Sequence, residues 1–90
     1  MRITGVKIRE PDPKSRCLAL ADVTLDGLIC VRDCKYTLEA VYFPSRRDLE
    51  GRWYPLVEIH NSELLFGIKD AVRKAYEIWL ADSIVTMKMQ

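Results

Sequence analysis

Residues 42–79 read YFPSRRDLEGRWYPLVEIHNSELLFGIKDAVRKAYEIW, and this stretch decides the fold. After Asn61, apolar residues recur at the i, i+3/i+4, i+7 spacing that places them on one face of a helix. The apolar positions are Leu64, Leu65, Ile68, Ala71, Val72, Ala75, Tyr76 and Trp79. Since one such face can cover one face of a sheet, the sequence predicts an amphipathic helix that packs on the strands before it.

The ends of this helix are predicted from local residue types. Asn61 or Ser62 can cap the first turn, because either side-chain oxygen can accept a hydrogen bond from a free backbone N–H group. Gly67 weakens the helix interior, but it also permits a close approach to the sheet. The apolar pattern then loosens, so the helix is expected to end near Asp82 or Ser83.

Five strands are predicted before the helix, from alternation of apolar and polar residues. They span residues 1–9, 17–25, 28–32, 38–43 and 52–59, with residues 10–16, 33–37 and 44–52 left as turns or loops. Gly5, at a switch in this alternation, predicts a β-bulge, and Asp26-Gly27 predicts a type I′ hairpin. The predicted fold class is therefore α+β, with an antiparallel sheet of about five strands and one C-terminal amphipathic helix.

The length of the chain, 90 residues, fits one domain. This domain is assigned to residues 1–83, and residues 84–90 are expected to form a short C-terminal extension. The formal net charge of +1 does not indicate a nucleic-acid binder, so such a function has to rest on local clustering. The N-terminus lacks the apolar core of a secretory signal, and no apolar run is long enough to span a membrane. The protein is therefore expected to be cytoplasmic and to make no membrane contact.

The chain has three cysteines, Cys17, Cys30 and Cys34, which could complete a zinc site with His60. The paired spacing of zinc knuckles is absent, so ordinary reduced cysteines are the favoured interpretation. There is no glycine-rich phosphate loop or hydrolase motif, and no nucleophile or carboxylate is spaced to serve His60. The sequence thus predicts no metal, no cofactor, no small-molecule substrate and no enzymatic activity.

The strongest candidate for a binding site is the arginine-bearing segment around the stretch from Pro44 to Gly51. Guanidinium groups can fork onto phosphate oxygens, and a serine hydroxyl can add one more phosphate contact. The candidate residues are Ser45, Arg46, Arg47 and Arg52. Asp48 and Glu50 lie among them, so two interpretations stay open: contact with nucleic acid, or a solvated charged loop.

A second group of cations, Lys69, Arg73 and Lys74, falls on the polar side of the predicted helix. Lys69 and Arg73 are four residues apart, so both could meet one phosphate backbone. Alternatively, Lys69 pairs with neighbouring acids and Arg73 with Glu77 in a ladder exposed to solvent. On the residues alone, the ladder is the favoured interpretation.

Aromatic residues flank the arginine segment at Tyr42, Phe43, Trp53 and Tyr54. Aromatic rings beside cations can stack on unpaired bases. Aromatics that alternate along strands are more often core residues, however, and the core interpretation is favoured.

Four segments of the chain together resemble the stage V sporulation protein G (SpoVG) family of septation regulators. They are MRITGVKIRE, LALADVTLDG, FPSRRDLEGRW and HNSELLFGIKDAVRKAYE, in that order across residues 1–80. The most specific pieces are Pro44-Ser45-Arg46-Arg47, Gly51 with Trp53, Asn61-Ser62 and Asp70-Ala71-Val72.

The resemblance implies a small bacterial cytosolic protein with a sheet and a C-terminal helix, which forms a homodimer through its strands. It also implies a site-specific regulator that binds DNA and RNA and is tied to sporulation or cell-division septation. It favours nucleic-acid contact by the arginine segment, with the cations of the helix in a secondary role.

A rival hypothesis is a protein-interaction adaptor that does not bind nucleic acid directly. In it, unpaired strand edges and the apolar C-terminal extension bind another protein. The apolar residues of the extension are Ile84, Val85, Met87 and Met89. Truncation after Asp82 distinguishes the two hypotheses, because only the adaptor would lose its partner.

Overall fold

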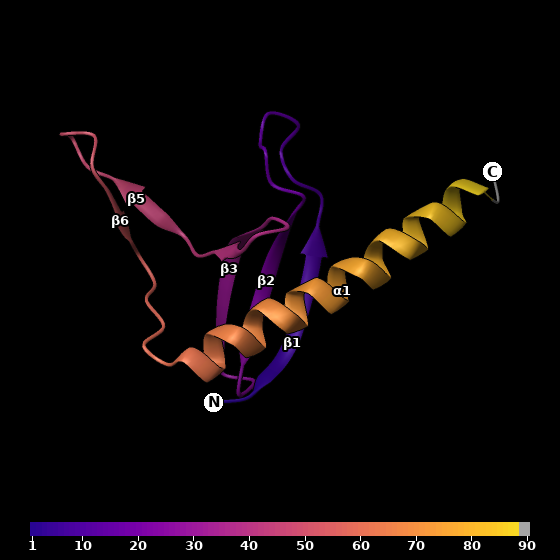
Figure 1. Ribbon diagram of the computed structural model, residues 1–90, viewed down its shortest axis with the longest axis horizontal. Coiled ribbons are helices and arrows are strands. Elements are labelled where there is room, and N and C mark those ends of the chain that lie inside the picture. Colours follow the sequence, from indigo (N-terminus) through magenta and orange to yellow (C-terminus); the bar gives the residue numbers. More distant parts are fainter. Residues whose placement is uncertain (89–90) are drawn as a thin grey trace.

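The computed structural model describes the backbone of residues 1–88 and the side chains of residues 1–82. In this part of the chain the elements are β1 (Ile3–Arg9), β2 (Ala19–Leu25), β3 (Ile29–Tyr36), β4 (Val41–Tyr42), β5 (Ser45–Arg47), β6 (Trp53–Pro55) and α1 (Ser62–Lys88). Strands β1 to β4 form one antiparallel sheet in that order, and β5 pairs with β6 in a separate hairpin. Helix α1 crosses one face of the sheet, and its C-terminal half extends beyond the sheet (Figure 1). The α+β class with one C-terminal helix is confirmed.

Two predicted features of the strands are confirmed. The pairing of β1 with β2 shifts register between Ile3 and Gly5, as expected for a bulge at the glycine. Asp26 and Gly27 connect β2 to β3 with positive φ angles of 54° and 64°. A type I′ turn requires this combination, so the hairpin follows directly from its two residues.

The predicted turn at residues 33–37 is wrong, because β3 continues to Tyr36. The register of β3 against β2 shifts near Asp22, where β3 contains one extra residue. Asp33 has a left-handed backbone conformation there (φ 60°) and donates its N–H to Asp22 Oδ1 at 3.1 Å. Asp33, the first residue of the expected turn, therefore marks a bulge inside a longer strand.

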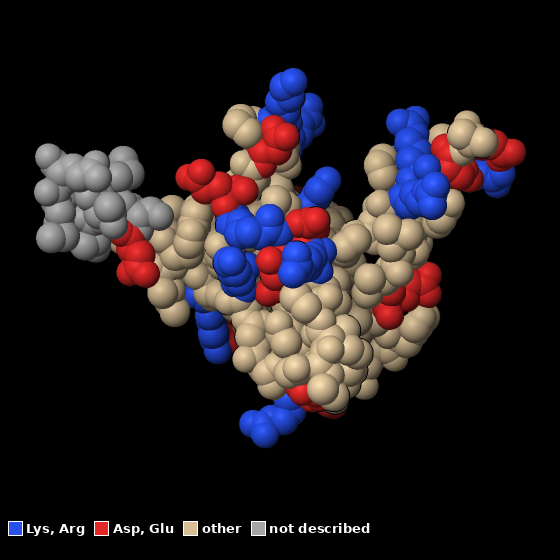
Figure 2. Space-filling view, turned by 180° about the vertical axis from the view of Figure 1, so that it is seen from behind, with Lys and Arg blue, Asp and Glu red and all other residues tan. Residues whose placement is uncertain are grey.

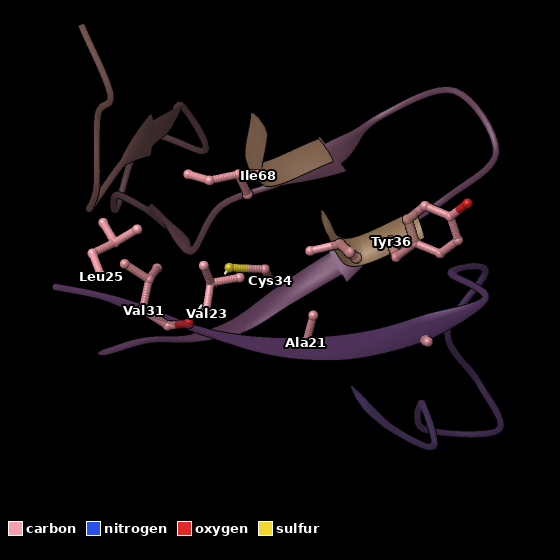
Figure 3. Packing of buried hydrophobic residues seen from close by; sticks show 9 residues of the cluster. Ala21, Val23, Leu25, Val31, Cys34, Tyr36 and Ile68 are labelled. Carbon is pink, nitrogen blue, oxygen red and sulfur yellow. Dashed lines mark hydrogen bonds between the residues drawn. The ribbon is translucent and has the colours of Figure 1, made fainter. Parts of the chain in front are cut away.

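The core lies between α1 and the sheet face formed by alternate residues of β2 and β3. Among the described side chains, nine apolar residues are buried there: Ala19, Ala21, Val23, Leu25, Val31, Cys34, Tyr36, Ile68 and Val72. Figure 3 shows the labelled side chains of both strands on the side of the sheet that faces Ile68. Burial alternates along β2, as expected for a strand with one face on the core. The apolar stripe of the helix is confirmed at Ile68 and Val72.

The start of α1 is fixed by a cap and by a close contact with the sheet. Asn61 Oδ1 accepts the Leu64 N–H at 2.8 Å, and the Asn61 carbonyl accepts the Leu65 N–H at 3.0 Å. Gly67 faces β1, because a Cβ added to it would lie 3.4 Å from Ile3 Cδ1. The close approach expected at this glycine is therefore present.

The predicted helix end near Asp82 or Ser83 is wrong, because α1 continues to Lys88. Residues 82–88 contain neither glycine nor proline, so no residue there interrupts the helical hydrogen bonds. The apolar pattern loosens where the helix passes beyond the sheet (Figure 1). Part of the predicted extension is thus helical, and Met89 lies outside the described residues. No described helix combines the length and the apolar character needed to cross a membrane.

The strands after β3 are shorter than predicted and are arranged differently. The fourth strand covers only Val41–Tyr42, and the predicted loop at residues 44–52 contains β5. The predicted strand at residues 52–59 is reduced to β6. Leu56 donates its N–H to the Pro44 carbonyl at 2.9 Å, which closes the base of the β5–β6 hairpin. The hairpin projects away from the sheet (Figure 1).

Candidate nucleic-acid interface

The predicted arginine segment forms a two-stranded arm of residues 45–55, here called the arginine arm. In this arm Arg46 pairs with Tyr54, and Arg47 pairs with Trp53. All residues of its two strands are exposed. Since neighbouring residues of a strand point to opposite faces, Arg46 and Arg47 lie on opposite sides of the arm. The adjacent arginines are therefore divided between the two faces of a ribbon.

Arg52 is neutralised within the turn of the arginine arm. Its guanidinium forms an ion pair with the Glu50 carboxylate, and its Nε lies 3.9 Å from Asp48 Oδ2. Asp48 also shapes the turn, since its Oδ1 accepts the N–H groups of Glu50 and Arg52 at 2.9 Å each. For Arg52, the interpretation of the segment as a solvated charged loop therefore holds.

Arg46 and Arg47 are not neutralised in this way. The Cζ of Arg47 lies 5.9 Å from the centroid of the Trp53 ring, a cation–π contact that holds the guanidinium over the ring. Within the described side chains, neither Arg46 nor Arg47 forms an ion pair. Ser45 is exposed at the start of β5. The arm thus presents two cations and a hydroxyl that are free to meet an anion.

The cations on α1 are largely held by one carboxylate. Asp70 lies 2.7 Å from Arg73 and 2.9 Å from Lys74, and Arg73 also lies 3.4 Å from Glu77. Hydrogen bonds from Lys74 and Arg73 lower the pKa of Asp70, so this carboxylate stays charged at neutral pH. The Arg73–Glu77 pair of the predicted ladder is confirmed. Lys69 forms no ion pair within the described part of the chain, so its expected pairing with neighbouring acids is wrong.

The sequence favoured a core role for the four aromatic residues that flank the arginines. This prediction is wrong for three of them. The side chains of Tyr42, Trp53 and Tyr54 are 53%, 66% and 45% exposed. Phe43 packs against the core. Helix α1 covers the sheet and leaves the arm uncovered (Figure 1), so strand alternation in the arm produces no burial.

A further charged surface covers the sheet face turned away from α1, here called the open face. Its residues are Lys7, Arg9, Leu20, Asp22, Thr24, Cys30, Arg32 and Lys35. Figure 2 views this side and shows basic and acidic groups together at its centre, apart from the arm. Arg9 bridges Asp22 at 2.7 Å and Asp33 at 2.5 Å. Sequence reasoning missed this surface, because the turn expected at residues 33–37 hid the outward position of Lys35.

The three cysteines lie in different environments: Cys17 is half-buried, Cys30 is exposed and Cys34 is buried. Burial raises the pKa of the Cys34 thiol to about 11, so it stays protonated at neutral pH. His60 Nε2 lies 3.0 Å from Glu58 Oε2, a carboxylate contact that was not expected, and both side chains are exposed. No group of three or more His, Cys, Asp or Glu residues in the described part of the chain is placed to hold a metal ion.

The fold and the arm together define a class of protein: a small α+β domain with a projecting basic hairpin and one uncovered sheet face. No family model matches the chain. A protein of Staphylococcus saprophyticus subsp. saprophyticus is 35% identical over 86% of this chain and 80% of its own length. Proteins of Staphylococcus carnosus and Macrococcus caseolyticus are each 32% identical over 86% of this chain, and over 76% and 70% of their own lengths. All three carry the name SpoVG and are described as septation proteins.

The chain belongs to the SpoVG family. The resemblance drawn from its four sequence segments is therefore confirmed. The similarity to the protein of Staphylococcus saprophyticus covers 86% of the chain.

Proposed function

We propose that the protein is a dimeric, site-specific nucleic-acid-binding regulator linked to sporulation and cell-division septation, and that it acts in the cytoplasm. The link to septation is supported by the relatives, whose names describe septation proteins and no enzymatic activity. The link to nucleic acid is supported by the charges of the arginine arm. These two lines of support are independent, since one comes from sequence similarity and the other from geometry.

One observation carries the proposal: Arg46 and Arg47 are exposed and form no ion pair with any described side chain. Each guanidinium can therefore fork onto phosphate oxygens without first leaving a carboxylate. Arg52 would have to leave Glu50, and two of the helix cations would have to leave Asp70. A two-stranded ribbon is also narrow enough to enter the major groove of a duplex.

Dimerisation would convert a weak contact into a usable one. With Arg52 held by Glu50, one arm offers about two free cationic contacts, whereas two arms related by symmetry offer about four. The four-stranded sheet has edges at β1 and β4, through which strands of two copies could pair. Large apolar side chains such as Leu28 and Leu38, at 86% and 83% exposure, would lose contact with water if a second copy covered them.

The test is a titration of a fluorescently labelled duplex, and of its separated strands, followed by anisotropy at several salt concentrations. We expect Arg46→Gln/Arg47→Gln to weaken binding about tenfold or more, and to reduce the slope of log K against log salt by about 2 per bound arm. Arg73→Gln/Lys74→Gln removes the same charge from α1, where Asp70 already balances it, and should cause a much smaller loss. Wild-type protein that binds neither probe, or an arm variant that binds like wild type, would overturn the proposal.

A protein-interaction adaptor is the second candidate, favoured by exposed apolar side chains on α1. Ile78 is 66% exposed and Leu80 is 40% exposed, and the helix continues to Lys88. Truncation after Asp82 should abolish oligomerisation or partner binding if the protein is an adaptor. It should spare nucleic-acid binding if the protein is the proposed regulator.

A further inference from the structure

The open face carries three cations that form no ion pair with any described side chain. They are Lys7 on β1 and Arg32 and Lys35 on β3, and all three are exposed. Two carboxylates, Asp22 on this face and Asp33 beside it, are both engaged by Arg9. With four cations against two carboxylates, this cluster has a formal charge of +2.

The carboxylates of the cluster do little to repel an anion. Arg9 holds Asp22 and Asp33 at 2.7 Å and 2.5 Å, and the Asp33 N–H also donates to Asp22. The Asp22 side chain is only 16% exposed, and the Asp33 side chain, which is 66% exposed, is balanced by Arg9. A polyanion that crosses the open face would therefore meet the three unpaired cations before it met a free carboxylate.

A cavity joins the open face to the arginine arm. Its lining includes Lys35, Tyr42, Ser45 and Trp53. Lys35 is directly opposite Tyr42 in the sheet, so the two side chains share a face. On the arm, Trp53 lies against the guanidinium of Arg47. Cations and exposed aromatic rings therefore follow one path from the sheet to one face of the arm.

We infer that this path binds single-stranded nucleic acid, with phosphates on the cations and bases stacked on Tyr42 and Trp53. The inference rests on the proposed function and names its substrate class. In a duplex the bases are stacked on one another, whereas in a single strand they can turn outward and stack on aromatic side chains. A duplex can use the cations of the path but not its rings. Only a single strand uses both.

The first test uses the fluorescence of Trp53 to detect binding along the path. Because the chain contains two tryptophans, Trp79→Phe leaves Trp53 as its only one. The probes are a single strand of about 16 nucleotides, as DNA and as RNA, and the corresponding DNA duplex. We expect both single strands to quench Trp53 fluorescence and to bind about tenfold more tightly than the duplex. Comparing the affinities of the DNA and RNA single strands shows which sugar the protein prefers.

The second test removes charge from the open face and compares it with an equal loss elsewhere. Arg32→Gln/Lys35→Gln should weaken single-strand binding about tenfold and lower the slope of log K against log salt by about 1. Arg2→Gln/Arg16→Gln is the matched control, since both residues are exposed and lie outside the path. The control should change binding less than twofold.

A third comparison uses the two faces of the arm. Arg47 shares the face of Trp53, whereas Arg46 lies on the other side, so Arg47→Gln should weaken single-strand binding more than Arg46→Gln. Equal losses would overturn the inference. So would equal quenching of Trp53 by duplex and single strand, or an Arg32→Gln/Lys35→Gln variant that binds like its control. In these cases binding itself persists and the proposed function stands. If neither nucleic-acid form binds the wild-type protein, the proposed function fails as well.

Discussion

The body of the molecule, made of β1, β2, β3 and α1, and the arginine arm are built in opposite ways. All nine buried apolar side chains of the described chain belong to β2, β3 and α1. Every strand residue of the arm is exposed. The arm is held by its own strand pairing, by the bond from Leu56 to Pro44, and by the turn around Asp48.

If the arm binds as proposed, this difference means that stability and recognition are separated in the fold. In the body, the fit of side chains in a close-packed core decides the free energy of unfolding. In the arm, the free charges and exposed rings decide what can bind. A substitution in the body should therefore change stability, and a substitution in the arm should change binding while the free energy of unfolding stays nearly constant.

The largest effect on stability is expected from Ile68→Ala. Ile68 is 1% exposed and lies where α1 meets the sheet (Figure 3), so its truncation leaves a cavity. The free energy of unfolding should fall by about 3 kcal/mol, measured by urea denaturation followed by circular dichroism. Phe66→Ala is the matched control on the same helix. Phe66 is 73% exposed, so its truncation should change the same quantity by no more than about 0.5 kcal/mol.

The control also tests the comparison itself. If Phe66→Ala destabilised the protein as much as Ile68→Ala, α1 would be covered on both sides in solution. A second surface, absent from the single chain, would then cover the exposed side of α1.

A smaller loss is expected from Asn61→Ala. Asn61 Oδ1 accepts the Leu64 N–H at 2.8 Å, and this bond satisfies a donor that the helix itself cannot. The free energy of unfolding should fall by about 1 kcal/mol, measured in the same denaturation experiment. Ser62→Ala is the control, because Ser62 is the alternative cap that the sequence left open. If Ser62→Ala lost more unfolding free energy than Asn61→Ala, Ser62 rather than Asn61 would be the residue that caps the helix.

The body could be predicted from the sequence because periodicity and burial coincide there. The alternation across Ala19–Leu25 and the helical spacing of Ile68 and Val72 describe two faces that meet in one core. Toward the C-terminal end of α1 most of the described side chains from Glu77 to Asp82 are exposed, and the apolar pattern loosens before the helix ends. The bulge at Asp33 was missed because the polar run at residues 33–37 is typical of a turn, and its sequence does not distinguish a turn from one residue inserted in a strand.

The arm could be predicted only in part, because its strands are exposed on both sides and periodicity there carries no burial signal. Residue type was sufficient to find Arg46 and Arg47 as candidates. Their separation onto two faces, and the capture of Arg52 by Glu50, depend on a hairpin that no strong turn motif announced. The open face was missed for a different reason: its cations come together only through the register of separate strands, and the turn expected at residues 33–37 ended β3 before Lys35.

A third effect, smaller than that of the cap and dependent on pH, is expected from Asp22→Asn. Arg9 lowers the pKa of Asp22 in the folded protein, so the charged pair stabilises the fold above the unfolded-state pKa of about 4. An asparagine can still accept the Asp33 N–H, which keeps the loss small. The difference in unfolding free energy between variant and wild type should be constant above about pH 5 and shrink as the pH falls through the folded pKa. A difference that persists unchanged down to about pH 2 would show that charge is not its cause.

The smallest effect on stability is expected from Trp53→Ala, although tryptophan is the bulkiest side chain of the arm. Trp53 is 66% exposed and contacts Arg47, so the free energy of unfolding should change by no more than about 0.5 kcal/mol. Single-strand affinity should nevertheless fall about tenfold, because stacking on one base contributes about 1–3 kcal/mol. Trp53→Phe keeps a ring and should retain most of this affinity in the same titration. A loss of stability as large as that of Asn61→Ala would mean that the arm packs against another surface in the assembled protein, and the separation of body from arm would then hold only for the isolated chain.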